Sequence, residues 1–374
     1  MDLSQEEFES NRKDFDNFRE YWYLFRYPNE LHDYLRFHNA LDRFAWLFRL
    51  RYADKKSIQS KRYRIDVLFQ SYIHENNISP SKVYRNIGGK KFSKEKFIYF
   101  LTQGWYNELA AAYPFVQEPM NLGTSIYNCK ENWKVELFPS WYIIKSYYAC
   151  YAFHNAFVFT NSEDTKTFQH KNTTNYFNNN LFQKYSKNLM FYPFNLTNSS
   201  NANVDLLRKV RKKEWGYQYA KYPRDSTKTI YDIETDYISD LERAKLDLKS
   251  KYDVSLINIL YLFRVWANYL GHETVVKLHS GGLILFLERN LYFINFLIAG
   301  LCELLAIGFL GEDEYVNTFK EFFANFIKGK DELYSNWYIV PQIIRLRIYK
   351  HLNLISYWPE EIEPPNNDKL ILLK

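Results

Sequence analysis

The residues with the clearest potential for chemistry lie at the end of one predicted helix, Ser255–His272. Arg264 and Asn268 are four residues apart beside its apolar face, so their polar ends can project into the same space. His272 follows directly after Gly271, the expected helix stop. An arginine, an amide and a histidine at one helix end can bind a phosphodiester and move a proton during its cleavage. The same groups could instead form a buried polar network.

A second candidate site combines positive charge with aromatic side chains. The stretch 205–224 holds the densest such mixture in the chain, including Arg211, Lys212, Lys213 and Tyr217. Cations can follow a phosphate backbone, and aromatic rings can stack on the bases of a single strand. We therefore expect nucleic-acid contact here. The alternative is a solvated helix end followed by a loop rich in tyrosine.

Familiar catalytic and cofactor motifs are absent from the sequence. It contains no HExxH, paired CxxC, GxSxG, Walker or Rossmann pattern. A metal-dependent nuclease of the PD-(D/E)xK type would have to use Asp66 with Glu95 and Lys96, but these residues fall in helical surroundings. The three cysteines are widely spaced and indicate neither a zinc site nor a disulfide framework. We expect no metal and no cofactor.

Composition favours a folded protein of the cytoplasm. The 374 residues are 47% hydrophobic and 25% charged, with a net charge of +6, which is ordinary for a globular chain. The N-terminal stretch 1–18 is charged throughout and does not have the pattern of a signal peptide. The 19% of aromatic residues is high, but an AT-rich genome can produce it, so it says little about function.

One segment, Leu291–Leu310, is long and apolar enough to cross a membrane. However, Asn295 and Glu303 lie inside it, and acidic rather than basic residues follow it. We therefore expect a central buried helix and no membrane contact. Asn295 and Glu303 should then find partners inside the protein, because an unpaired buried carboxylate is costly.

Helical periodicity dominates the rest of the chain and predicts an all-α, multi-helix bundle with at least about 60% helix. The expected helices are 6–25, 31–52, 65–75, one beginning near Pro80, 97–113, 141–160, 168–182, 230–251, 255–272, 291–310, 314–328 and 341–355. A short strand pair is expected only at 133–138. Breaks in the pattern suggest an N-terminal helical region (1–130), a central bundle (131–310), and C-terminal helices with an extended tail (311–374).

The central bundle resembles the HEPN superfamily of small α-helical bundles over about residues 140–275. Members of that family often open with a helix that carries two adjacent tyrosines and a following His or Asn, and helix 141–160 reads Tyr147-Tyr148-Ala-Cys-Tyr-Ala-Phe-His154-Asn155. The run Phe168-Gln-His-Lys171 is similar to the start of the family's second helix. The resemblance implies that Tyr148 and His154 support the site.

A later HEPN helix carries an arginine followed, after four to six residues, by a histidine. Arg264 resembles this arginine, and the resemblance implies Arg264, Asn268 and His272 as catalytic residues. The chain departs from the pattern because seven residues separate Arg264 from His272. Tyr269, with four residues between, stands where the family has the histidine. Tyrosine, with a pKa near 10, is a poor proton shuttle at neutral pH.

The resemblance implies that RNA is cut without a metal, at a site formed where two bundles of a homodimer meet. We therefore expect a HEPN-like ribonuclease, or a toxin-type effector of a bacterial defence or toxin–antitoxin system. The alternative is a catalytically inactive helical scaffold that binds RNA or a protein partner, for example in a defence or antitoxin complex. In an enzyme the acceptor for Arg264 would be a substrate phosphate, and in a scaffold it would be a carboxylate such as Glu303 or a main-chain carbonyl.

A second arginine and histidine, Arg345 and His351, satisfy the HEPN spacing with five residues between. They lie near the C-terminus of helix 341–355, without a preceding paired helix. Basic residues at a helix C-terminus interact favourably with the helix dipole. We therefore expect this pair to be structural.

Overall fold

The computed structural model describes residues 28–53, 64–87, 93–116, 139–160, 170, 227–248, 254–265, 267, 283–328, 340–359 and 362. Within these ranges 84% of residues are helical and none is in a strand. The predicted all-α, multi-helix fold is confirmed. The expected helix 6–25 and the strand pair at 133–138 lie outside the described residues, as does the expected helix 168–182 apart from His170.

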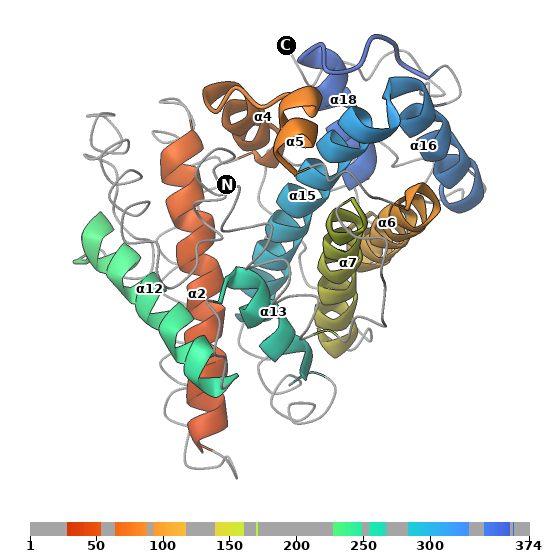
Figure 1. Cartoon of the computed structure of the whole chain (residues 1–374). Coiled ribbons are helices and arrows are strands. Elements are labelled where there is room, and N and C mark those ends of the chain that lie inside the picture. Colours follow the sequence, from red (N-terminus) through yellow and green to blue (C-terminus); the bar gives the residue numbers. More distant parts are fainter. Residues whose placement is uncertain are drawn as a thin grey trace.

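Ten α-helices make up the described structure. In chain order they are α2 (Pro28–Tyr52), α4 (Ile65–Glu75), α5 (Pro80–Ile87), α6 (Lys94–Val116), α7 (Pro139–Phe159), α12 (Ile230–Asp247), α13 (Leu256–Val265), α15 (Leu283–Leu310), α16 (Glu312–Phe326) and α18 (Pro341–His351). Figure 1 shows α15 running through the middle, with α2 and α12 on one side of it and α6 and α7 on the other.

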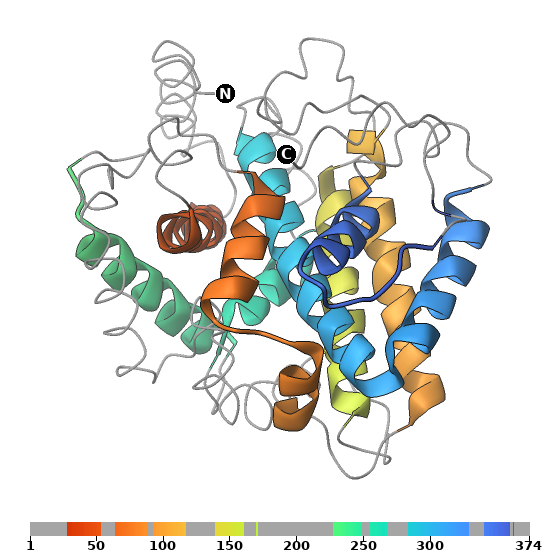
Figure 2. The same cartoon turned by 90° about the horizontal axis from the view of Figure 1, so that it is seen from above.

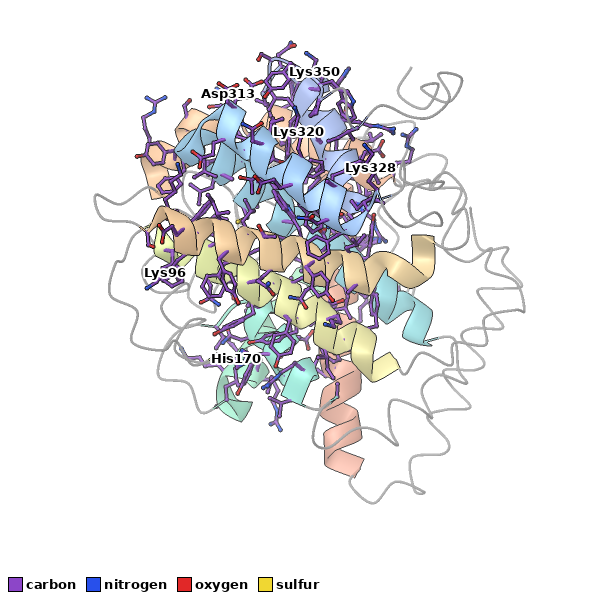
Figure 3. All side chains as sticks on the ribbon, turned by 90° about the vertical axis from the view of Figure 1, so that its right-hand side faces the viewer. Lys96, His170, Asp313, Lys320, Lys328 and Lys350 are labelled. Atoms are coloured by element: carbon purple, nitrogen blue, oxygen red, sulfur yellow. The ribbon has the colours of Figure 1, made fainter. Side chains whose placement is uncertain are left out.

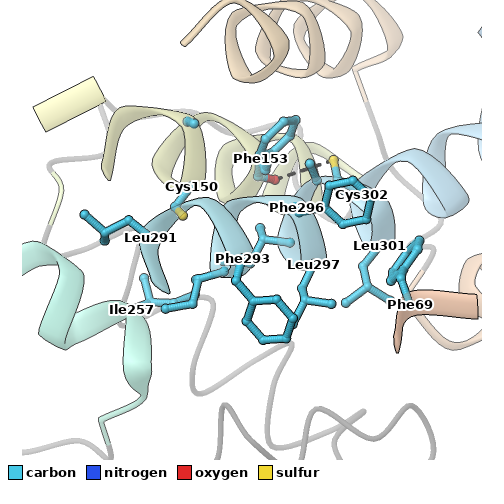
Figure 4. Close-up of a cluster of buried hydrophobic side chains, with 14 of the residues drawn as sticks. Phe69, Cys150, Phe153, Ile257, Leu291, Phe293, Phe296, Leu297, Leu301 and Cys302 are labelled. Atoms are coloured by element: carbon cyan, nitrogen blue, oxygen red, sulfur yellow. Dashed lines mark hydrogen bonds between the residues drawn. The ribbon is translucent and has the colours of Figure 1, made fainter. Parts of the chain in front are cut away.

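Helix α15 is the centre of the hydrophobic core. Its part Asn290–Leu310 is long and apolar enough to span a membrane, yet 83% of the most apolar stretch is buried inside the protein. Figure 4 shows Phe296, Leu297 and Leu301 of α15 in a buried cluster with Phe153 of α7 and Phe69 of α4. A helix that is apolar on all sides is stable in water only when other helices cover it. The prediction of a central buried helix is confirmed.

The two polar residues that were expected to need internal partners, Asn295 and Glu303, both have them. Asn295 accepts a hydrogen bond from the thiol of Cys150 on α7, at 2.7 Å between Sγ and Oδ1. Glu303 is fully buried and accepts a hydrogen bond from Trp105 Nε1 on α6 at 2.7 Å. It also pairs with Arg345 of α18 at 2.7 Å. These contacts tie α15 to its neighbours at fixed positions along its length.

Several predicted helix boundaries were wrong. Helix α2 begins three residues earlier than expected, and α12 and α18 each end four residues earlier. Helix α6 continues through Pro114 to Val116, whereas the expected end was Tyr113. A proline lacks one backbone hydrogen-bond donor. Near a helix end, the free energy lost with that hydrogen bond is small compared with the stabilisation from packing of the whole helix. Helix α15 begins at Leu283, eight residues earlier than the apolar run from Leu291 indicated.

Helices α6 and α7 lie side by side, as Figures 1 and 2 both show. Gly104 of α6 makes this close approach geometrically feasible, because a Cβ there would lie 2.4 Å from the ring of Phe153 on α7. Phe153 is fully buried and cannot move aside easily. Helix α7 therefore packs closely against α6. Helix α13 also packs against α7.

A single cluster of buried apolar residues extends across the described helices. It includes Phe97 of α6, Phe153 of α7 and Leu346 of α18, which come from the three predicted regions 1–130, 131–310 and 311–374. The helices that carry the candidate site are thus held by one shared core.

Candidate nucleic-acid interface

The helix that carries Arg264 begins at a side-chain cap. The backbone N–H of Ile257 donates to Ser255 Oγ at 3.3 Å, and the backbone N–H of Ser255 donates to Asn258 Oδ1 at 2.9 Å. Two backbone donors that a helix start would leave without partners are thereby satisfied. Ser255 therefore caps the start of α13. Helix α13 buries Leu256, Ile259 and Phe263 in the core and places Arg264 in its last turn, half-buried.

Arg264 contacts two adjacent tyrosines of α7. Its Nη2 donates to the hydroxyl of Tyr148 at 3.4 Å. Its Cζ lies 5.8 Å from the centre of the Tyr148 ring and 5.9 Å from that of the Tyr147 ring. Guanidinium groups at this distance from tyrosine rings are attracted to the π electrons. The structure thus brings together two residues that the sequence predicted for one site, Arg264 and Tyr148.

A histidine that was not among the predicted site residues joins them. His170 Nδ1 lies 3.1 Å from the hydroxyl of Tyr147. The imidazole ring centre is 4.2 Å from the ring of Tyr151, 5.7 Å from Tyr148 and 6.5 Å from Tyr261. Figure 3 shows His170 beside α7 and α13. We call the six residues Tyr147, Tyr148, Tyr151, His170, Tyr261 and Arg264 the tyrosine–arginine cluster.

Burial and charge set the protonation states in this cluster. Burial raises the pKa of Tyr147 well above its ordinary value, and the nearby Arg264 charge offsets only part of that rise. Burial and the same Arg264 charge both lower the pKa of His170 below its ordinary 6.5. At neutral pH the site therefore holds a protonated tyrosine, an uncharged imidazole and a positive guanidinium.

The cluster has the chemistry of a nucleotide site. Tyr147 is buried, whereas the other five members are half-buried and retain some exposure to solvent. Aromatic rings can stack on bases, and a partly desolvated guanidinium can hold a phosphate more strongly than an exposed one. Within the described part of the chain, no group of three or more His, Cys, Asp or Glu residues could hold a metal ion.

His154, which was expected to support the site, is buried on α7, and its role stays a prediction. It is 1% exposed, and burial lowers its pKa to about 3. An imidazole with so low a pKa stays neutral throughout the physiological range and cannot exchange protons with a substrate in solvent. The sequence placed it correctly on helix α7 but could not show that this part of the helix is covered.

Several other predicted residues lie outside the described residues. These are the remaining members of the Arg264 group and the whole basic-aromatic stretch: Asn268, Tyr269, His272, Arg211, Lys212, Lys213 and Tyr217. Their roles stay predictions. His170 carried one signal in the sequence, since the run Phe168-Gln-His-Lys171 resembled the start of a HEPN second helix.

The second arginine–histidine pair is structural, as expected. Arg345 is fully buried and bonds to two carboxylates at once, Glu108 of α6 at 2.6 Å and Glu303 of α15 at 2.7 Å. His351 is exposed at the end of α18. The suggestion that Glu303 could be the acceptor for Arg264 was wrong, because Arg345 occupies this carboxylate.

The residues that a PD-(D/E)xK nuclease would have to use lie on two different helices, Asp66 on α4 and Glu95 and Lys96 on α6. Asp66 pairs with Arg64 through Oδ1 and Oδ2, at 3.1 Å and 2.5 Å. Glu95 and Lys96 are exposed in the first turn of α6.

Comparison with known proteins gives no match: no protein-family model, no curated protein and no solved structure is similar to this chain at a significant level.

Proposed function

We propose that the protein binds single-stranded RNA at the tyrosine–arginine cluster and acts as a HEPN-like, metal-independent ribonuclease. The observation that carries the proposal is the placement of Arg264, half-buried at the end of α13, beside the hydroxyl of Tyr148 and within reach of His170. A cation, two hydrogen-bonding groups and several aromatic faces together match the phosphate, sugar and bases of a single strand.

In this proposal Arg264 stabilises the negative charge that builds up on the phosphate during cleavage. Its guanidinium already lies against the rings of Tyr147 and Tyr148, which limit its rotamers before any ligand arrives. A donor that is fixed in advance costs less to organise in the transition state. By the HEPN resemblance, proton transfer falls to His272, and the complete site is made by two copies of the chain. The setting would be bacterial defence or a toxin–antitoxin pair.

The alternative is a catalytically inactive scaffold that binds RNA or a protein partner through the same bundle. One observation favours it: the imidazole in the cluster, His170, has a lowered pKa and is a weak proton carrier at neutral pH. A protein with Arg264 and His170 alone could hold a phosphodiester without cutting it.

The experiment is to measure cleavage of a labelled single-stranded RNA by the wild type, Arg264→Ala and Arg85→Ala, all in EDTA. Arg85 is the matched control, because it is an exposed arginine on α5 that bonds only locally, to the carbonyl of Ser81. We expect the wild type and Arg85→Ala to cut equally and Arg264→Ala to lose activity by a factor of about 100 or more. Circular dichroism would establish that each variant is folded.

Three results would overturn parts of the proposal. A folded Arg264→Ala protein with undiminished cleavage would remove Arg264 from the site. A wild-type protein that binds RNA but never cuts it would leave the scaffold as the correct alternative. A monomer in light scattering at working concentration would contradict the two-copy site.

A further inference from the structure

We propose that His170 is a second phosphate-binding residue, held by Tyr147 as the neutral imidazole that carries its hydrogen on Nε2. That N–H would donate to an oxygen of the same phosphate that Arg264 binds. The inference rests on the proposed function, since it assumes a phosphodiester at the cluster. It goes further by assigning a role to His170, which was not among the predicted site residues.

The hydrogen of the Tyr147 hydroxyl needs an acceptor inside the protein. Tyr147 is 1% exposed, so water cannot satisfy this hydrogen, and a buried donor without an acceptor is costly. Among the described residues its hydrogen-bond partner is His170, with 3.1 Å between the hydroxyl oxygen and Nδ1. Burial also raises the pKa of Tyr147, so the hydroxyl keeps its proton. Tyr147 is therefore the donor and Nδ1 the acceptor.

The hydrogen bond from Tyr147 determines which of the two His170 ring nitrogens carries the hydrogen. A nitrogen that accepts a hydrogen bond carries no hydrogen itself, so the neutral imidazole must carry its hydrogen on Nε2. The charged form would carry hydrogens on both nitrogens and would turn Nδ1 towards Tyr147 as a donor. The Arg264 charge and partial burial oppose that form, which is why the pKa of His170 is lowered.

A neutral His170 suits the charge of a phosphodiester that Arg264 already binds. A phosphodiester carries one negative charge, and Arg264 supplies one positive charge. A neutral N–H adds a directed hydrogen bond without adding a second positive charge beside Arg264. Neutral imidazoles are known to polarise oxygen atoms in this way in enzymes. The ring of Tyr151, whose centre is 4.2 Å from that of the imidazole, fixes the ring position.

The tautomer can be read directly from the nitrogen chemical shifts of labelled histidine in the full-length protein. The chain has eight histidines, and the signal lost in His170→Gln identifies the right one. We expect the Nε2–H form at neutral pH in the wild type. Tyr147→Phe should convert it to a mixture of tautomers and raise the pKa of His170, because the hydrogen bond that favours the neutral form is gone. An Nδ1–H form or an imidazolium at neutral pH would overturn the assignment.

The phosphate role is tested with a short single-stranded RNA and fluorescence anisotropy. We expect His170→Ala to bind about tenfold more weakly than the wild type, which is the usual effect of losing one hydrogen bond to a charged group. His170→Gln, whose side-chain amide can donate from near the Nε2 position, should recover part of the loss. Arg85→Ala, whose side chain is exposed on α5 outside the cluster, serves as the control and should bind like the wild type.

The outcomes separate this inference from the proposed function. If Arg264→Ala loses RNA binding while His170→Ala and His170→Gln bind like the wild type, the proposed site stands and the role of His170 is refuted. If Arg264→Ala binds RNA normally, the proposed function fails and the phosphate role of His170 fails with it. Loss of binding in both variants, with partial recovery in His170→Gln, supports both.

Discussion

Replacing Arg345 by methionine removes the positive charge on which two buried carboxylates depend. Arg345 is fully buried, and its guanidinium donates to Glu108 at 2.6 and 2.7 Å and to Glu303 at 2.7 and 2.9 Å. Methionine has a similar length and keeps most of the apolar packing. The change therefore tests the charge rather than the volume of the side chain.

The size of the effect follows from what each carboxylate retains. Glu303 keeps hydrogen bonds from Trp105 Nε1 at 2.7 Å and from the Tyr349 hydroxyl at 2.8 Å. Glu108 keeps one from Gln342 at 2.9 Å. Breaking a buried ion pair by removing one partner costs about 3–5 kcal/mol. We expect Arg345→Met to lose about 5 kcal/mol of unfolding free energy, because both buried carboxylates lose the cation that they share.

The assay is urea unfolding followed by circular dichroism, with His351→Ala as the control. His351 is exposed on the same helix and should change the unfolding free energy by less than about 0.5 kcal/mol. The triple variant Arg345→Met, Glu108→Gln and Glu303→Gln has no buried charge left and should regain much of the loss. An Arg345→Met protein that loses less than about 1 kcal/mol would refute the view that this ion-pair network holds α6, α15 and α18 together.

Further predictions concern the same core. Burial raises the pKa of Glu108 from 4.5 to about 7, so this residue contributes stability that is fully present below about pH 4.5 and lost as the pH rises through about 7. The loss is about 3 kcal/mol from the pKa difference, and Glu108→Gln should flatten this part of a stability curve measured by urea unfolding. Gly104→Ala should cost about 1–3 kcal/mol in the same assay, because its Cβ would meet Phe153, whereas Gln103→Ala beside it should cost less. Cys150 and Cys302 are fully buried and their pKa values are raised, so a thiol reagent should modify them only in denaturant; rapid labelling of either in the native protein would contradict their burial.

Local sequence patterns were sufficient to predict much of the fold. Helix α4 begins and ends at the predicted residues, Ile65 and Glu75. Its apolar periodicity and its flanking polar residues indicate the same bounds. The burial of α15 could be predicted because Asn295 and Glu303 inside an apolar run favour a protein interior over lipid. The end of α6 could not be predicted from the local sequence. Pro114 favours an earlier stop, whereas packing against residues distant in the chain stabilises the helix as far as Val116.

The polar contacts were harder to predict because they join residues far apart in the chain. Arg345 meets Glu108 across 237 residues and Glu303 across 42, and no periodicity encodes such a pairing. The same limit applies to the candidate site. The family resemblance predicted Arg264 and Tyr148 for one site, but the approach of His170 to Tyr147 depends on the tertiary fold. The burial of His154 depends on it too.

The most direct test of the central claim is photo-cross-linking of a short single-stranded RNA to the native protein, with the modified peptides identified by mass spectrometry. We predict cross-links at the half-buried tyrosines of the cluster, Tyr148 and Tyr261, and their loss in Arg264→Ala but not in Arg85→Ala. Cross-links that are absent from α7 and α13, or that persist unchanged in folded Arg264→Ala, would contradict an RNA site at the tyrosine–arginine cluster.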